Sequence, residues 1–215
     1  MRKQKRLVLI TGNSRSGTTW LSRVLRAKDL DVRHEYVGEH GTVSCFFFMD
    51  TPWYPFSPST HPKGLIAHVG ERLRQYEFEH RFHLVRDPLR TIGSIWSTIG
   101  REHQRWLEEF GVIDPGIKPK MLKAMHIWYE VNRRCTQATD HRFRLEDLVL
   151  GEKAWRAMSR MLSTSIDLPT IPPSNKSRGI FLARRVTMKM MRAADPFLAK
   201  SICRMAVAYG YKEYK

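Results

Sequence analysis

The chain has 215 residues, a length typical of one domain with a sizeable core. Hydrophobic residues make up 42% and charged residues 27%, a balance that excludes a disordered or fibrous chain. With 37 Lys and Arg against 21 Asp and Glu, the formal net charge of +16 indicates an anionic partner. This positive charge is compatible with several anionic partners: nucleic acid, a nucleotide, a sulfated or phosphorylated substrate, or an acidic membrane surface.

The three cysteines lie far apart and form no CxxC pair, which argues against a structural zinc site or a disulfide framework. Such a low, odd count is typical of a reducing compartment, so we expect a cytoplasmic protein. The sequence contains no run of 18 apolar residues, and a membrane-spanning helix is therefore not expected.

Apolar runs and helical periodicity alternate along the chain. They predict strands over 6–11, 30–33, 43–49, 64–68, 81–86 and 141–145, and helices over 18–28, 71–79, 88–99, 120–138, 154–162 and 181–209, the last interrupted at Asp195-Pro196. Alternation of this kind indicates one α/β domain over 1–215 with a mainly parallel sheet.

The first chemistry-bearing motif is the polar loop from Gly12 to Thr19, which lies between the first strand and the first helix. Glycines let successive backbone N–H groups turn inward, and the helix N-terminus adds further donors, so the loop suits an anion. A nucleotide-kinase loop has Lys where this chain has Thr18, which argues against ATP with magnesium. A plain strand-to-helix turn with a glycine cap is the alternative.

The second motif, Arg86 to Trp96, again follows a strand and opens a helix, with Pro88 in the first turn. Arg86 and Asp87 could form a local ion pair at the helix start. Asp87 could also be a magnesium-holding acid, as in nucleotide hydrolases.

The run Arg15-Ser-Gly-Thr-Thr-Trp20 resembles the 5′-phosphosulfate loop of the sulfotransferase family, in particular its bacterial and carbohydrate-type members. The resemblance implies a P-loop-like three-layer sandwich with a central, mainly parallel sheet. It also implies 3′-phosphoadenosine 5′-phosphosulfate as donor and no metal. In this scheme Arg15 replaces the family's lysine and neutralises charge on the leaving oxygen. The loop residues Ser16, Gly17, Thr18 and Thr19 would hold the 5′-phosphate. Trp20 would stack on the adenine, unless it is a core aromatic.

The second motif resembles the family's 3′-phosphate site, in which an arginine at a strand end acts with a serine eight positions later. The matching residues are Arg86 and Ser94. Arginine offers bidentate contacts to a phosphate, and a helical hydroxyl adds another donor. By the same resemblance, Arg178 or Lys176 is a candidate for a further cation at this phosphate. The segment from Arg142 to Leu148 also resembles a family segment, with Glu146 and Asp147 starting a helix.

Sulfuryl transfer to a hydroxyl requires a group that accepts the acceptor's proton. Glu35, after the second strand, is our first candidate, because related enzymes place an acidic base there. His68 is the second, and Glu39, His40 and His61 stay open as further alternatives. Either residue could instead be structural, Glu35 as a partner of the many cations and His68 as a hydrogen-bonded histidine. Trp53 and Tyr54 are candidates for stacking on an acceptor ring.

The predicted function is therefore transfer of a sulfuryl group to a hydroxyl or amine of a small-molecule, sugar or lipid acceptor. A P-loop nucleotide kinase or NTP hydrolase is the alternative enzyme. A nucleic-acid-binding domain would explain the charge, but no stacking or zinc-finger motif supports it. A family member that binds nucleotide without turnover is also open, as is peripheral contact with an anionic membrane.

Overall fold

The computed structural model describes residues 3–45, 76–98, 107–108, 111–164 and 184–214. Its five strands are β1 (Gln4–Gly12), β2 (Val32–His34), β3 (Gly41–Ser44), β4 (Tyr76–Val85) and β5 (His141–Arg144). Its helices are α1 (Thr18–Arg26), α3 (Pro88–Thr98), α5 (Lys120–Ala138), α6 (Leu145–Leu150), α7 (Glu152–Met161), α8 (Met188–Ala194), α9 (Pro196–Ala208) and the 3₁₀ helix η1 (Lys212–Tyr214).

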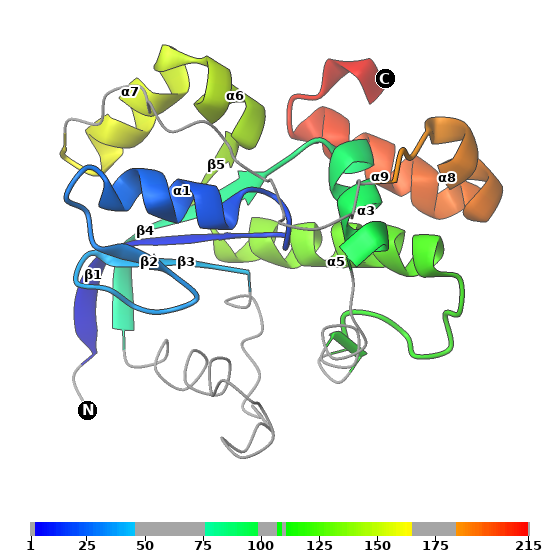
Figure 1. The fold of residues 1–215 in the computed structure, drawn as a ribbon, viewed down its shortest axis with the longest axis horizontal. Coiled ribbons are helices and arrows are strands. Elements are labelled where there is room, and N and C mark those ends of the chain that lie inside the picture. The colour runs from blue at the N-terminus through cyan, green and yellow to red at the C-terminus, as the bar shows by residue number, and fades with distance from the viewer. Residues whose placement is uncertain (1–2, 46–75, 99–106, 109–110, 165–183, 215) are drawn as a thin grey trace.

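The strands form one sheet in the order β2-β3-β1-β4-β5, and every neighbouring pair is parallel. Helices α1, α6 and α7 lie on one side of the sheet and α5 on the other (Figure 1). The structure confirms the predicted three-layer α/β sandwich, with a described sheet that is wholly parallel. Parallel sheets need both faces covered, which explains why the central strands read as continuous apolar runs.

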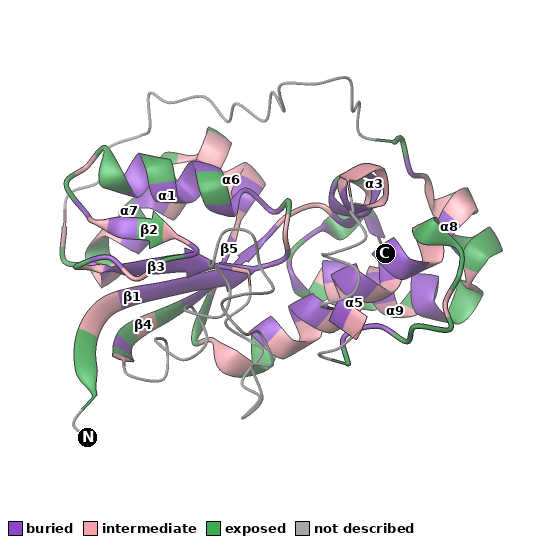
Figure 2. Cartoon of the chain, turned by 60° about the horizontal axis from the view of Figure 1, so that its bottom comes forward, coloured by how far each residue is buried: buried purple, intermediate pink, exposed green. Residues whose placement is uncertain are grey.

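Side chains of the central strand β1 alternate between the two layers. Val8 and Ile10 pack with α1, α6 and α7, whereas Leu9 contacts the opposite side beside Phe78. A larger cluster joins α3, α5, α8 and α9 around the fully buried Trp128. Figure 2 shows this division, with buried residues gathered in the sheet and on the helix faces turned toward it.

One predicted helix is wrong. Residues 76–79, which the sequence assigned to a helix over 71–79, form the first part of β4 and pair with β1 from Gln4 to Arg6. Phe78 is buried while Glu77 and Glu79 are exposed, an alternation typical of a strand with one covered face. The helix-forming propensity of glutamate misled the prediction, because the pairing partner lies more than 70 residues away.

Other elements are present with shifted ends. The strand predicted at 30–33 is β2, and the described part of the strand predicted at 43–49 is β3, which ends at Ser44. The tail helix begins at Met188, where the hydroxyl of Thr187 accepts the N–H of Met190. The strand predicted at 64–68 lies outside the described residues. Among the described helices, none combines the length and apolar character needed to cross a membrane.

A buried polar network joins β4 to α5. His83 is fully buried, and its Nε2 lies 3.0 Å from Oδ1 of Asn132. The hydroxyl of Tyr209 donates to the backbone carbonyl of Asn132 at 3.1 Å, and the ring of Tyr209 meets His83 edge-on. Burial lowers the pKa of His83 from 6.5 to about 3, so the imidazole is neutral in the folded protein.

This burial predicts acid sensitivity. Below pH 6.5 the unfolded chain protonates His83, while the folded chain does so only near pH 3, so the free energy of unfolding falls as pH drops between these values. The slope from this residue approaches about 1.4 kcal/mol per pH unit. In urea titrations from pH 7 to 4, His83→Gln should flatten the slope, since glutamine does not titrate. His141→Gln, which removes a histidine at an exposed position, is the matched control. Equal slopes for wild type and His83→Gln would contradict the assignment.

Candidate functional site

The candidate site lies at the carboxyl edge of the sheet, between β1 and β4. The chain leaves β1 toward β2 and β3 on one side, and leaves β4 toward β5 on the other. In open parallel sheets, such a reversal opens a crevice at the carboxyl ends of the two strands. Both predicted motifs emerge there, the first after Gly12 and the second after Val85.

The loop after β1 is a tight turn. The backbone N–H and the hydroxyl of Ser16 both donate to the carbonyl of Asn13, at 3.1 and 2.6 Å. Arg15 has a left-handed φ of 73° and Gly17 one of 97°. A side chain at Gly12 would collide with the carbonyl oxygen of Leu84, because an added Cβ would lie 2.2 Å from it. Gly12 thus allows close packing of the loop against β4, and Gly17 provides the left-handed turn before α1.

Asn13 anchors this loop to the helix on the far side of the sheet. Its Nδ2 lies 3.4 Å from the carbonyl of Ile127 and 3.3 Å from that of Trp128, both on α5. Its Oδ1 is buried without a hydrogen-bond partner among the described residues. The sequence did not single out Asn13, because its partners lie in a helix more than 100 residues away.

The N-terminus of α1 offers donors to an anion. Gly17 is its N-cap, no side chain caps the first turn, and that turn contains no acidic residue. Thr18 is buried and Thr19 is exposed, both in the first turn. Backbone N–H groups and a positive helix end favour a phosphate or sulfate group, so the residues present fit the 5′ side of the expected donor.

His34, at the end of β2, faces these two threonines. Its Nε2 lies 3.2 Å from Thr18 Oγ1 and 3.3 Å from Thr19 Oγ1. Burial lowers its pKa, the neighbouring Glu35 opposes this effect, and Arg23 adds to it. His34 was not among the residues predicted from the sequence to act as the base. Its position at a strand end, next to Glu35, was the feature of the sequence that could have marked it as a site residue.

Glu35 lies behind His34 rather than in the pocket. Its side chain is buried, and its carboxylate accepts the Ser44 hydroxyl at 2.7 Å and the Cys45 N–H at 3.0 Å. One oxygen lies 3.6 Å from Nε2 of His34. Burial, with Glu35 nearby, raises the pKa of the Cys45 thiol well above its ordinary value. The structure therefore places Glu35 as a support for the end of β3 and for His34.

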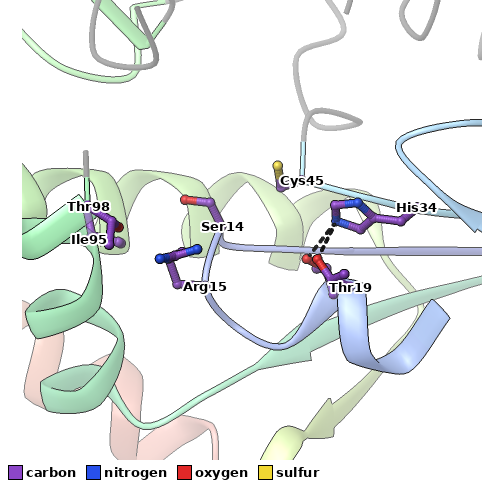
Figure 3. Close-up of a pocket in the computed structure, with 8 residues that line it drawn as sticks. Ser14, Arg15, Thr19, His34, Cys45, Ile95 and Thr98 are labelled. Atoms are coloured by element: carbon purple, nitrogen blue, oxygen red, sulfur yellow. Dashed lines mark hydrogen bonds between the residues drawn. The ribbon is translucent and has the colours of Figure 1, made fainter. Parts of the chain in front are cut away.

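Thr19, His34 and Arg15 line a pocket of about 280 Å³. The full lining consists of Ser14, Arg15, Thr18, Thr19, His34, Cys45, Ile95 and Thr98. Figure 3 shows Ser14 and Arg15 between His34 and Thr19 on one side and the α3 residues Ile95 and Thr98 on the other. Arg15 forms no ion pair with any described residue, and burial lowers its pKa. The pocket therefore presents a cation beside hydroxyl and imidazole groups.

Arg86 joins the two motifs. Its Nη1 donates to the backbone carbonyl of Arg15 at 2.9 Å, which fixes the end of β4 against the loop after β1. Burial lowers the pKa of Arg86, although the nearby Glu146 opposes the shift. Ser94 lies on α3, in the same helix as the pocket residues Ile95 and Thr98. The structure thus brings the loop and Arg86 together, as the resemblance implied, and places Ser94 on the neighbouring helix.

Trp20 occupies the core. It is 5% exposed and packs edge-on against Trp155 of α7, with ring centroids 6.1 Å apart. Trp20 is therefore a core aromatic, the alternative that the sequence left open, since little of the ring is open to an adenine. Helix α1 has to bury one face against the sheet, and its period places Trp20 on that face with Leu21 and Val24. The candidates His68, Arg178, Trp53 and Tyr54 lie outside the described residues.

No protein-family model and no curated protein matches this chain. A solved structure described as a sulfotransferase domain from the curacin biosynthetic pathway is similar, with a TM-score of 0.50 and 15% sequence identity. The match covers 98% of this chain and 99% of that chain. At this identity the similarity concerns the fold, and it agrees with the P-loop-like α/β sandwich described above.

The loop geometry makes a stability prediction for Gly17. An added Cβ would lie 2.6 Å from Cδ1 of Leu145, a buried core residue that has little room to move. Gly111 also has a positive φ, but an added Cβ there meets nothing within 4 Å. Gly111→Ala should cost about 1 kcal/mol from backbone strain alone. Gly17→Ala should lower the free energy of unfolding by at least about 2 kcal/mol more than Gly111→Ala, because the core around Leu145 must deform. Urea unfolding of both variants measures the difference. Equal losses would show that Leu145 does not confine the loop.

Proposed function

We propose that this protein transfers a sulfuryl group from 3′-phosphoadenosine 5′-phosphosulfate to a hydroxyl or amine of an acceptor. The observation that carries the proposal is the hydrogen bond between Arg86 and the carbonyl of Arg15. It makes two anion-binding motifs, each at the end of a parallel strand, parts of one site. A ligand with phosphates at both ends of a nucleoside suits such an arrangement.

The 5′ side of the donor would bind to the loop. Backbone N–H groups at the start of α1 and the hydroxyls of Thr18 and Thr19 would hold the phosphosulfate. Arg15 faces the pocket without an ion pair among the described residues, so its charge is available to the group that departs. The expected reaction forms a bond from the acceptor oxygen or nitrogen to sulfur and breaks the bond from sulfur to the bridging oxygen. The protein contributes position and charge stabilisation.

The 3′-phosphate would bind near Arg86, with Ser94 as a second donor. Arg178 is proposed as a further cation at the 3′-phosphate. No metal is needed for this scheme, because Arg15, Arg86 and the helix N-terminus provide the positive charge. The adenine contact is left unassigned, since Trp20 is buried in the core.

The acceptor's proton would pass to His34, with Glu35 behind it. His34 lines the pocket, and its Nε2 lies 3.6 Å from the Glu35 carboxylate. A lowered pKa keeps the imidazole neutral near pH 7, the form that accepts a proton. His68 remains the second candidate.

A P-loop kinase or NTP hydrolase is less well supported. Thr18 takes the place of the kinase lysine. Asp87, the candidate magnesium acid, accepts the N–H of Arg90 at 2.8 Å and the hydroxyl of Tyr214 at 2.6 Å, so both of its oxygens have partners.

For the acceptor we propose a small molecule, a sugar or a lipid, and for the location the cytoplasm. The exposed cations of α8 and α9, such as Arg192, Lys200 and Arg204, support contact with an anionic membrane surface. The same charge does not imply sequence-specific nucleic-acid binding.

Donor binding and transfer test the proposal. Adenosine 3′,5′-bisphosphate should raise the melting temperature of the protein, whereas ATP with magnesium should not. Transfer of labelled sulfate to a panel of hydroxylated acceptors should depend on the donor. Arg15→Ala should lower kcat about 100-fold or more while bisphosphate still binds, because the lost charge acts on the leaving group. Arg26→Ala, an exposed arginine in the last turn of α1, is the control. Stabilisation by ATP with magnesium alone would overturn the proposal in favour of the kinase alternative.

The proton-accepting role of His34 predicts a pH profile. Because burial lowers its pKa below 6.5, kcat/KM should be constant near neutral pH and decline only in more acidic solution. His34→Gln keeps a polar group beside Thr18 and Thr19 but should lose most of the activity and the acidic decline. An unchanged profile in His34→Gln would assign the proton to another residue.

A further inference from the structure

Two carboxylates flank Arg86, yet neither pairs with it. Glu146 and Asp87 both act electrostatically on its guanidinium. Neither forms an ion pair with Arg86 in the part of the chain that the structure describes. An arginine beside two acids ordinarily forms an ion pair with one of them, which would compete with an anionic ligand.

The four oxygens of these carboxylates are occupied by other donors. Glu146 accepts the Tyr211 hydroxyl at 2.8 Å and the backbone N–H of Asp87 at 3.1 Å. Asp87 accepts the Tyr214 hydroxyl at 2.6 Å and the backbone N–H of Arg90 at 2.8 Å. Each acid is therefore held by one backbone group and one tyrosine.

The segment that carries the tyrosines is fixed in place. Tyr211 and Tyr214 are 3% and 8% exposed, and their rings meet edge-on. Arg144 donates to the carbonyl of Gly210 at 2.7 Å and lies over the ring of Tyr211. The same guanidinium makes two hydrogen bonds to Asp147, at 2.7 and 2.6 Å, so it is itself held rigidly.

The hydroxyls of both tyrosines are protonated at neutral pH and act as donors. Burial raises the pKa of both Tyr211 and Tyr214, and the adjoining carboxylates raise it further. Hydrogen bonds from a neutral donor to a carboxylate are strong when the pair is partly buried.

We infer that Tyr211 and Tyr214 are positioning residues that keep Glu146 and Asp87 turned away from Arg86, so that its guanidinium is left for the 3′-phosphate of the donor. This inference rests on the proposed function. It assigns selectivity for a 3′-phosphorylated nucleotide to a segment that follows α9, remote in sequence from both anion-binding motifs.

The test compares two ligands in calorimetric titrations at constant salt. Adenosine 3′,5′-bisphosphate carries the 3′-phosphate and adenosine 5′-phosphate lacks it. The Kd of the 5′-phosphate divided by the Kd of the bisphosphate therefore measures the preference for a 3′-phosphate, to which Arg86 contributes. In Tyr211→Phe and Tyr214→Phe the freed carboxylate should pair with Arg86. The ratio should then fall about tenfold, mainly through weaker bisphosphate binding. In assays, the KM for the donor should rise more than kcat falls.

Two further variants separate positioning from general damage. Tyr209→Phe removes a buried hydroxyl from the same segment, but that hydroxyl bonds to the carbonyl of Asn132 and to Thr136, not to a carboxylate, so the ratio should stay unchanged. Adding Glu146→Gln to Tyr211→Phe should restore the ratio, because glutamine keeps an acceptor for the Asp87 N–H without the competing charge.

The outcomes distinguish the inference from the proposed function. A wild type that prefers the bisphosphate, with the same preference in Tyr211→Phe and Tyr214→Phe, would overturn the inference and leave the function standing. Equal losses for both ligands in these variants would also overturn it, since that pattern indicates general loss of the site. A wild type without preference for the 3′-phosphate would overturn both.

Discussion

The hydrogen bond from Arg86 to the carbonyl of Arg15 joins two segments that are 71 residues apart in the chain. It is possible because parallel strands end at one edge of the sheet, and because the connections after β1 and β4 leave in opposite directions. The crevice between them receives the start of α1, the loop with Arg15, and the strand end with Arg86. The proposed donor site follows from this one juxtaposition.

The surroundings of the site are organised to leave positive charge available. Glu35 is hydrogen-bonded to Ser44 and Cys45, and Asp87 and Glu146 to tyrosines and backbone N–H groups. An acid that is already satisfied has less to gain from turning toward Arg15 or Arg86. For anion binding at this site, the hydrogen bonds that hold the nearby carboxylates therefore matter more than the net charge of the whole chain.

Much of this could be predicted from local patterns. The sheet layers and the two motifs follow from local features: the apolar run before Gly12, the glycine spacing of the loop and the start of a helix at Pro88. Each of these features depends only on neighbouring residues. The beginning of β4 was missed, since Tyr76 and Phe78 become strand residues only by pairing with β1. The role of Trp20 was ambiguous for a similar reason, because the face that α1 buries is settled by Trp155 on α7.

The residues that sequence reasoning missed at the site act through partners distant in sequence. Asn13 bonds to α5, and Tyr214 bonds to Asp87 across 127 positions. His34 carried a weaker signal, since only its place at a strand end marked it. Contacts of this kind depend on how the elements pack, and no local spacing encodes them.

The most direct test of a single two-phosphate site is a crystal structure of the protein with adenosine 3′,5′-bisphosphate. A single two-phosphate site predicts the 5′-phosphate against the backbone N–H groups from Gly17 to Thr19 and the 3′-phosphate on Arg86. A nucleotide bound elsewhere, or with only one phosphate on these two motifs, would contradict it.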